Sequence, residues 1–163
     1  MSTDPRPLVR AAGPQDVPAI HGLIGELADY ERLRHQFVGT PAQLAQHLFG
    51  PRPCAWALVA EVDGVVRGFA LAFRSFSTFL CQPGIYLEDL YVQPDWRRQG
   101  LGKALLTALA RQAVEEGCGR LEWAVLDWNA PSIAFYRQLG AQPMDEWTTF
   151  RLTGDALSRL AAG

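Results

Sequence analysis

A short basic loop near the middle of the chain has the residue types and spacing that bind a phosphate group. Arg97, Gly100 and Gly102 form the pattern Arg-x-x-Gly-x-Gly after a predicted strand and at the start of a predicted helix. Unpaired backbone N–H groups at a helix start attract anions, and glycine lets a ligand approach the backbone closely. The alternative is an ordinary tight turn into a helix with solvated basic side chains. The pattern is neither a Walker P-loop nor the GxGxxG of dinucleotide-binding folds.

Acidic residues beside aromatic residues could hold a positively charged substrate. The candidates are Tyr30-Glu31, Glu88-Asp89 and Asp145-Glu146-Trp147. Carboxylates pair with a cationic amine, and aromatic faces attract it. The alternatives are a solvated charged run over residues 29–34 for Glu31 and a solvent-facing strand position for Glu88. In an ideal strand Asp89 points to the face opposite Glu88, unless a bulge re-aims it.

Hydrophobic patterns predict the elements that must position these side chains. Strands are predicted over residues 8–11, 55–62, 65–73, 85–92, 121–126 and 147–152. Helices are predicted after Asp16, after a capping box at Thr40, over 100–116 and 131–139, and in a short tail after Asp155. The turn Asp63-Gly64 predicts a hairpin, and residues 75–84 are predicted to be a loop. This order predicts one α/β (α+β) domain over residues 1–163, with helices on a mixed sheet.

Composition and charge exclude several classes of protein. The chain has 163 residues, 48% hydrophobic and 20% charged, which is typical of a globular domain. Its 15 basic and 17 acidic residues give a net charge of −2, so it has no general attraction for nucleic acids or anionic membranes. The sequence shows neither a membrane span nor a secretory signal. We therefore expect a cytoplasmic protein that binds neither nucleic acid nor membrane.

The cysteines and histidines do not predict a metal site. The three cysteines are far apart and form no CxxC pair, so reduced thiols are expected. The histidines also lack the spacing of metal ligands. A covalent acyl-enzyme on Cys81 or Cys118 is disfavoured, because neither lies near a histidine in the sequence.

Longer segments extend the pattern of the loop. Residues 26–31 read ELADYE, residues 86–92 read YLEDLYV, and residues 127–136 read DWNAPSIAFY. With the basic loop, these segments resemble the GNAT superfamily of N-acetyltransferases, most closely its diamine (spermidine/spermine) and thialysine branch. The resemblance covers residues 8–152. It implies a GNAT acyl-CoA N-acyltransferase fold with strands that splay at the cofactor site, acetyl-CoA as co-substrate, no metal, and a homodimer.

The resemblance implies which residues contact acetyl-CoA. The pyrophosphate rests on the loop formed by Arg97, Arg98, Gln99, Gly100, Leu101, Gly102 and Lys103. The pantetheine arm adds to the strand edge at Leu90, Tyr91 and Val92. The turn of Asn129, Ala130, Pro131 and Ser132 closes over the cofactor, although Asn129 could serve only as a helix cap.

The resemblance also implies catalytic roles for Glu88 and Tyr136. A primary amine has a pKa of about 10 and must lose a proton before it attacks the thioester. Glu88 accepts that proton, directly or through water, and Tyr136 protonates the departing sulfur. A backbone N–H near Tyr91 or Val92 stabilises the oxyanion. The alternative for Tyr136 is a core position on an apolar helix.

The amine contacts implied by the resemblance come from several elements. They are Tyr30, Glu31, Glu88, Asp89, Glu122, Trp123 and Ala124, with Glu146 and Trp147 arriving from a dimer partner. Polyamine enzymes carry an acidic residue before the Tyr-Leu-Glu-Asp strand, whereas residues 77–84 have no carboxylate here. This difference favours a shorter amine, such as thialysine, a lysine-like amino acid or a small diamine. Two other functions stay open: acetylation of a protein N-terminus or lysine, and a non-catalytic acyl-CoA sensor.

Overall fold

The turn at Asp63-Gly64 forms the first hairpin of the sheet. Asp63 has φ of 51° and Gly64 has φ of 76°, and a two-residue type I′ turn requires positive φ at both positions. Val62 pairs with Val65 directly across this turn. The predicted hairpin is therefore confirmed, with strands β2 (Trp56–Val62) and β3 (Val65–Ser77).

The computed structural model describes residues 7–163.

Thr40 opens the second α-helix with the predicted capping box, in which its hydroxyl accepts from the Gln43 N–H. The remaining elements are β1 (Leu8–Ala11), α1 (Val17–Tyr30), α2 (Pro41–Phe49), β4 (Gln82–Val92), α3 (Leu101–Glu115), β5 (Leu121–Trp123), α4 (Ala130–Gln138) and α5 (Gly154–Ala161), with short 3₁₀ turns η1 (Pro14–Asp16), η2 (Arg34–Gln36) and η3 (Pro94–Trp96).

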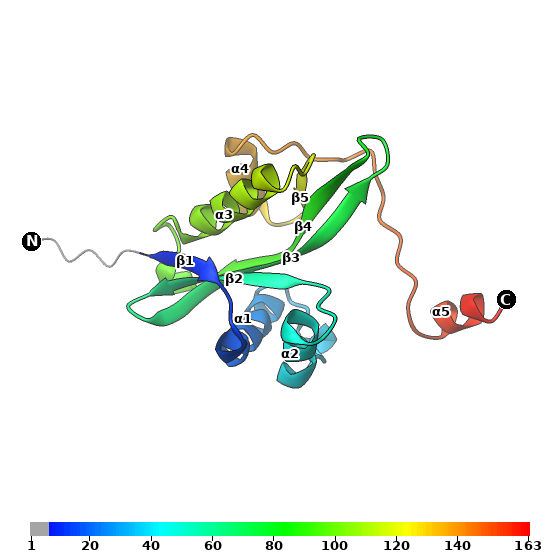
Figure 1. Cartoon of the computed structure of the whole chain (residues 1–163), viewed down its shortest axis with the longest axis horizontal. Helices are drawn as coiled ribbons and strands as arrows, with labels where there is room; N and C mark the ends of the chain where they lie inside the picture. Colours follow the sequence, from blue (N-terminus) through cyan, green and yellow to red (C-terminus); the bar gives the residue numbers. More distant parts are fainter. Residues whose placement is uncertain (1–6) are drawn as a thin grey trace, which may run out of the picture. The chain divides into compact units, whose positions relative to one another are not determined.

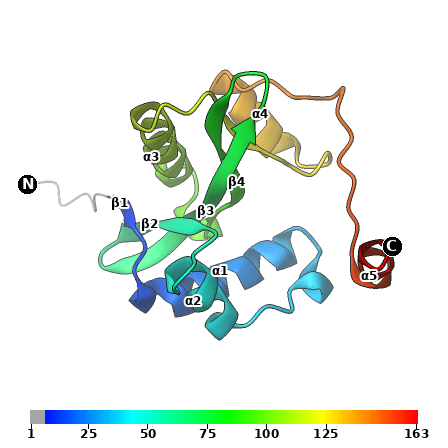
Figure 2. The same cartoon turned by 45° about the vertical axis from the view of Figure 1, so that its right-hand side comes forward.

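The strands form one mixed five-stranded sheet in the order β1-β2-β3-β4-β5. Neighbouring strands are antiparallel except β4 and β5, which are parallel. Helices α1 and α2 cover one face and α3 covers the other (Figures 1 and 2). On the α1 face, Ile20 and Leu23 pack with Val59 and Phe69 in the hydrophobic core. This sheet with helices on both faces confirms the predicted fold class.

The chain separates into two compact units, Met1–Ala124 and Val125–Gly163. The first unit contains the whole sheet and helices α1 to α3. The second unit contains α4 and α5. The single domain over residues 1–163 stays a prediction.

The prediction of a loop over residues 75–84 is wrong, because the hairpin of β3 and β4 continues through most of this segment. Ser75 pairs with Gly84, and Ser77 pairs with Gln82. Pro83 does not interrupt β4, because it is the second residue of the strand and proline is tolerated near a strand start. The turn is closed by the Leu80 N–H, which donates to the Ser77 hydroxyl oxygen over 3.2 Å.

Two other predicted strands differ from the structure. The strand predicted over 121–126 ends at Trp123. The strand predicted over 147–152 is wrong: this segment forms no regular element and leaves Trp147 76% and Phe150 92% exposed. Its aromatic and β-branched residues favour a strand, but a strand needs a partner for its backbone hydrogen bonds, and none pairs with it in the described chain.

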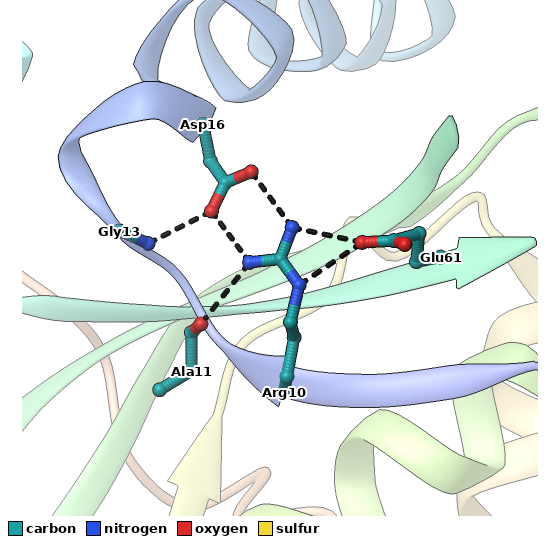
Figure 3. A network of polar contacts seen from close by, with 5 residues as sticks. All are labelled: Arg10, Ala11, Gly13, Asp16 and Glu61. Atoms are coloured by element: carbon teal, nitrogen blue, oxygen red, sulfur yellow. Dashed lines mark hydrogen bonds and ion pairs between the residues drawn. The ribbon is translucent and has the colours of Figure 1, made fainter. Parts of the chain in front are cut away.

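Arg10 joins the first strand to the start of α1 and to β2 (Figure 3). Its guanidinium donates to both carboxylate oxygens of Asp16, over 2.7 and 3.0 Å, and its Nε donates to Glu61 over 2.9 Å. Asp16 also accepts from the Gly13 N–H over 2.8 Å. The Asp16 side chain is only 6% exposed and that of Arg10 is 31% exposed, so the carboxylate is buried while the guanidinium keeps some contact with water. Arg10 holds the pKa of Asp16 below its ordinary value.

We predict that Asp16→Asn destabilises the protein by about 2 kcal/mol at neutral pH, because a buried hydrogen-bonded charge pair is broken. Since the native pKa of Asp16 lies below the unfolded value of 3.8, this stabilisation is complete above that value and is lost as the pH falls through the native pKa. Urea unfolding at several pH values measures the difference.

Asp29→Asn is the matched control, because the Asp29–Arg34 ion pair is mostly exposed and such pairs contribute little. Equal effects of the two substitutions would contradict the role given to Asp16.

Candidate functional site

A β-bulge in β4 places the acidic side chains of this strand. Asp89 pairs with Leu71 and Leu87 pairs with Ala72, so Glu88 is an extra residue with no partner on β3. Leu71 packs against the core cluster that includes the residues of α1. Residues directly opposite on antiparallel strands share a face, so Asp89 lies on the α1 side of the sheet. The bulge therefore re-aims the strand, the case that the sequence left open.

The carboxylates of Glu31, Glu88 and Asp89 form an acidic cluster. Burial, and then the negative charges of Glu88 and Glu31, raise the pKa of Asp89 to about 7. Burial and the charge of Glu88 also raise the pKa of Glu31. Like charges this close cannot all ionise without cost. The structure thus brings together three residues, from the end of α1 and the middle of β4, that the sequence predicted to contact a cationic substrate.

This cluster can bind a cation and exchange a proton near neutral pH. A bound ammonium group would offset the repulsion between the carboxylates. A carboxyl group with a pKa of about 7 exists in both protonation states near neutral pH, which suits it to accept and release a proton. The exposed Glu88 lies beside it on the bulge.

Strand β4 has an open edge beyond its pairing with β5. That pairing joins only Ile85 with Leu121, Tyr86 with Glu122, and Leu87 with Trp123. The two strands therefore part beyond Leu87, as the resemblance implied. On the other side the Gln93 N–H donates to the Arg67 carbonyl over 2.9 Å, so by alternation Leu90 and Val92 present their backbone groups to the open edge.

The basic loop ends in an uncapped helix start. Arg98 has φ of 62° and Gly100 has φ of 83°, and left-handed residues in such a turn form concavities of N–H groups that bind anions. No side chain caps the first turn of α3, in contrast to the Thr40 cap of α2. A Cβ added to Gly102 would meet only the Val92 side chain, at 4.0 Å. The backbone is thus accessible, and the loop fits the pyrophosphate of a nucleotide.

The side chains of the loop divide into two groups. Arg97, Arg98, Gln99 and Lys103 are all exposed. Arg97 nevertheless has partners within the protein, because it donates from Nε to the Val92 carbonyl over 2.9 Å and lies over the rings of Tyr30 and Tyr91. The predicted cofactor residues of the loop and strand edge therefore lie together in the first unit, and their contacts with acetyl-CoA stay a prediction.

The predicted amine contacts on β5 lie beside β4. Glu122 pairs in register with Tyr86 and forms an ion pair with Arg120 over 3.0 Å. Burial raises the pKa of Tyr86, and the charges of Glu88 and Glu122 raise it further. Glu122 is therefore within electrostatic reach of the same tyrosine as Glu88. Trp123 ends β5, and Ala124 follows it.

The other predicted site residues belong to the second unit. Asn129 caps α4: its side-chain oxygen accepts from the Ser132 N–H over 3.4 Å, and Ala130 and Pro131 begin the helix. Tyr136 lies on α4, and Glu146 and Trp147 lie in the exposed extended segment. The cap is thus observed, while the cofactor contact of Asn129, the approach of Tyr136 to Glu88, and the placement of Glu146 and Trp147 stay predictions.

Sequence reasoning assigned no role to Glu26 and Gln93. The Gln93 side-chain amide donates to Glu26 over 3.2 Å, and Glu26 acts on the nearby Tyr91, whose pKa is raised first by burial and then by this carboxylate. The available signal was the spacing on α1, where Glu26 lies four residues before Tyr30 and so shares its face.

Residues 7–163 contain neither a membrane-spanning helix nor a cluster of metal ligands. None of the described helices is long and apolar enough to span a bilayer. Within the same residues, no cluster of three or more histidine, cysteine, aspartate or glutamate side chains is arranged to hold a metal ion.

Known proteins resemble this chain over nearly its whole length. A model of the acetyltransferase (GNAT) family matches residues 23–141. The L-ornithine N5-acetyltransferase of Arabidopsis thaliana is 39% identical, over 93% of this chain and 86% of that protein. The thialysine N-epsilon-acetyltransferase of Bos taurus is 38% identical, over 94% of this chain and 96% of that protein. Among solved structures, an integron cassette protein from the mobile metagenome of V. cholerae has a TM-score of 0.80 at 25% identity, over 96% of this chain and 98% of that one.

We predict that Glu88→Gln lowers the pKa of Asp89 from about 7, because a neighbouring negative charge is removed while burial remains. Carboxyl-carbon NMR across a pH titration measures this value directly. Glu122→Gln is the control, since Glu122 does not act on Asp89 and its removal should leave the midpoint in place. An unchanged midpoint in Glu88→Gln would show that the two carboxylates are not coupled.

Proposed function

Because the chain belongs to the acetyltransferase (GNAT) family and is an N-acetyltransferase, we propose that it moves an acetyl group from acetyl-CoA to a primary amine of a small cationic substrate. The observation that carries this proposal is the acidic cluster of Glu31, Glu88 and Asp89. A cluster of like charges is costly in a free protein and becomes favourable when it binds a cation.

The substrate class follows from charge and from the relatives. The two relatives are named as acetyltransferases of ornithine and of thialysine. Both compounds are small amino acids with a side-chain amine. The hairpin turn before the Tyr-Leu-Glu-Asp strand carries no carboxylate in this chain, so a long polycation would lack one anchoring charge there. We therefore favour an ornithine-like or thialysine-like amino acid or a small diamine over spermidine and spermine.

The open edge of β4 and the basic loop supply a binding site for acetyl-CoA. The amide-rich pantetheine arm can pair with the backbone groups of Leu90 as an added strand, whereas the Val92 carbonyl already accepts from Arg97. The pyrophosphate can accept from the free N–H groups at the start of α3, with Arg98 and Lys103 adding positive charge. This arrangement would lay the thioester along β4, toward the bulge with Glu88 and Asp89.

The proposed reaction is direct transfer. Glu88 and Asp89 take a proton from the bound ammonium group, and the freed amine nitrogen forms a bond to the thioester carbonyl carbon. The Val92 N–H, which faces the open edge, donates to the oxyanion that develops. The carbon–sulfur bond then breaks, Tyr136 donates its phenolic proton to the sulfur, and the second proton of the nitrogen returns to the Tyr136 oxygen. The products are the N-acetylated amine, coenzyme A with its free thiol, and one proton.

A homodimer is the second part of the proposal. The exposed Trp147 and Phe150 lie in a segment that has strand-type residues but no strand partner in the described chain. A second copy would cover these aromatic side chains and would bring Glu146 and Trp147 to the acceptor site. We expect twice the chain mass of 18.0 kDa in solution.

We also propose that the protein works in the cytoplasm and without a metal ion. All three cysteines are free thiols, and Cys54 and Cys81 are exposed, as is typical of proteins from a reducing compartment. Direct transfer from a thioester to an amine needs no metal.

We predict that Gly102→Ala weakens coenzyme A binding by about ten-fold because its methyl group would block the backbone that meets the pyrophosphate. Stability should not fall, since the new Cβ has open space and alanine favours a helix by about 1 kcal/mol. Calorimetry with coenzyme A and urea unfolding measure the two quantities. Gly22→Ala on α1, also open around its Cβ, is the control and should leave coenzyme A affinity intact.

The proposed function is tested by thiol release from acetyl-CoA with a panel of amines: ornithine, thialysine, small diamines, spermidine, spermine and peptides. We expect the amino acids or diamines to be preferred and the rate to rise with pH through about 7, as Asp89 ionises. Tyr136→Phe should lower kcat by about 100-fold while coenzyme A affinity is kept. Acetylation of peptides alone, or no thiol release with any amine, would contradict the proposal.

A further inference from the structure

Arg97 makes contacts with the protein itself that an arginine would not need if it served only to bind a phosphate group. Its Nε donates to the Val92 carbonyl over 2.9 Å. Its guanidinium carbon lies 5.1 Å from the ring centre of Tyr30 and 5.4 Å from that of Tyr91. The positive charge of Arg97 also opposes the rise in the pKa of Tyr91 that burial and Glu26 cause. We call this group of Arg97, Val92, Tyr91 and Tyr30 the Arg97 clasp.

The clasp ends the open edge of β4. Val92 is the last residue of the strand, and its carbonyl faces the edge away from β3. Because Arg97 occupies this carbonyl, the carbonyl is satisfied before any ligand adds to the strand. Arg97 and the adjacent Arg98 are both exposed, but the Arg98 side chain makes no hydrogen bond or ion pair within residues 7–163. The two neighbouring arginines thus differ in orientation: Arg98 is available to an anion, and Arg97 is engaged by the protein.

The clasp also reaches the end of α1. Tyr30 is the last residue of this helix, and Glu31 follows it as the cap. The chain then turns sharply, with Arg32 at φ of 61°, and the Leu33 N–H donates to the Ala28 carbonyl over 2.8 Å, which closes the backbone of the helix end. Tyr91 is buried. A cation between the two rings attracts both and therefore ties the end of α1 to the buried part of β4.

Glu31 gains its position from this tie. It belongs to the acidic cluster, where its charge acts on Asp89 across the gap between α1 and β4. A shift of the last turn of α1 would move Glu31 away from Asp89 without disturbing the sheet. The clasp joins the last residue of α1, next to Glu31, to β4, and the bond from Gln93 to Glu26 joins the preceding turn.

We propose that Arg97 is a positioning residue for the amine substrate: through Tyr30 it holds Glu31 against Glu88 and Asp89, and Arg98 and Lys103 are the side chains that serve the pyrophosphate. This inference rests on the proposed function for its kinetic test. It differs from the role expected from the sequence, in which Arg97 contacts the cofactor.

The experiment compares Arg97→Gln with Arg98→Gln, because each removes one positive charge from the same loop. Arg97→Gln should raise KM for the preferred amine by about five-fold, the effect of losing contacts of cation–π strength, and leave the dissociation constant for coenzyme A unchanged. Arg98→Gln should do the reverse. Tyr30→Leu should reproduce the effect of Arg97→Gln, and adding it to Arg97→Gln should cause little further change. Arg97→Lys, which keeps the charge over the rings, should restore part of the amine affinity.

A spectroscopic measurement tests the same inference without turnover. Loss of a positive charge by itself would raise the pKa of a nearby carboxyl, whereas withdrawal of Glu31 would lower that of Asp89. We expect the NMR titration midpoint of Asp89 to fall in Arg97→Gln and to stay in place in Arg98→Gln. A rise or no change in Arg97→Gln would overturn the proposal, and so would weaker coenzyme A binding by that variant, with or without a change in KM for the amine.

Failure of the proposed function gives a different result. In that case the wild-type protein releases no thiol with any amine of the panel, while the Asp89 titration still decides whether Arg97 positions Glu31.

Discussion

The extra residue at Glu88 in β4 is the constraint on which the acidic cluster depends. Side chains alternate along a strand, so Glu88 and Asp89 would point to opposite faces of a regular ladder. The bulge interrupts the alternation: Leu87 stays in the core on one side, and Asp89 shares a face with Leu71 and α1. Only then can both carboxylates act on Glu31. One unpaired backbone position therefore decides whether the chain has this acidic cluster.

The same strand carries both halves of the candidate site. Its middle holds the acidic cluster, and its open edge beyond Leu87 leads to the basic loop at residues 97–103. Negative charge thus gathers where an amine would bind, and accessible N–H groups gather where an anion would bind. Each half leaves groups in the protein that a ligand of opposite charge would satisfy. Such departures from a self-satisfied structure are expected at functional sites.

The local elements could be predicted because their causes lie within a few residues. The Asp63-Gly64 hairpin, the Thr40 cap and the glycine loop before α3 each follow from neighbouring residue types, and the structure contains all three. The wrong predictions concern segments whose structure depends on pairing with another strand. Residues 75–84 continue a hairpin because two segments find each other, and residues 147–152 are not a strand because they find no partner in the described chain.

The sequence by itself determined the family, the element order up to α4 and the residue types available for chemistry, since motifs and periodicity are local properties. It also placed Glu31, Glu88 and Asp89 among the candidates. The tertiary structure alone decided that these three act on one another and that Arg97 turns to Tyr30 and Val92. The physical reason is that the strand register, the bulge and the packing of α1 on the sheet are set by contacts between residues far apart in the chain.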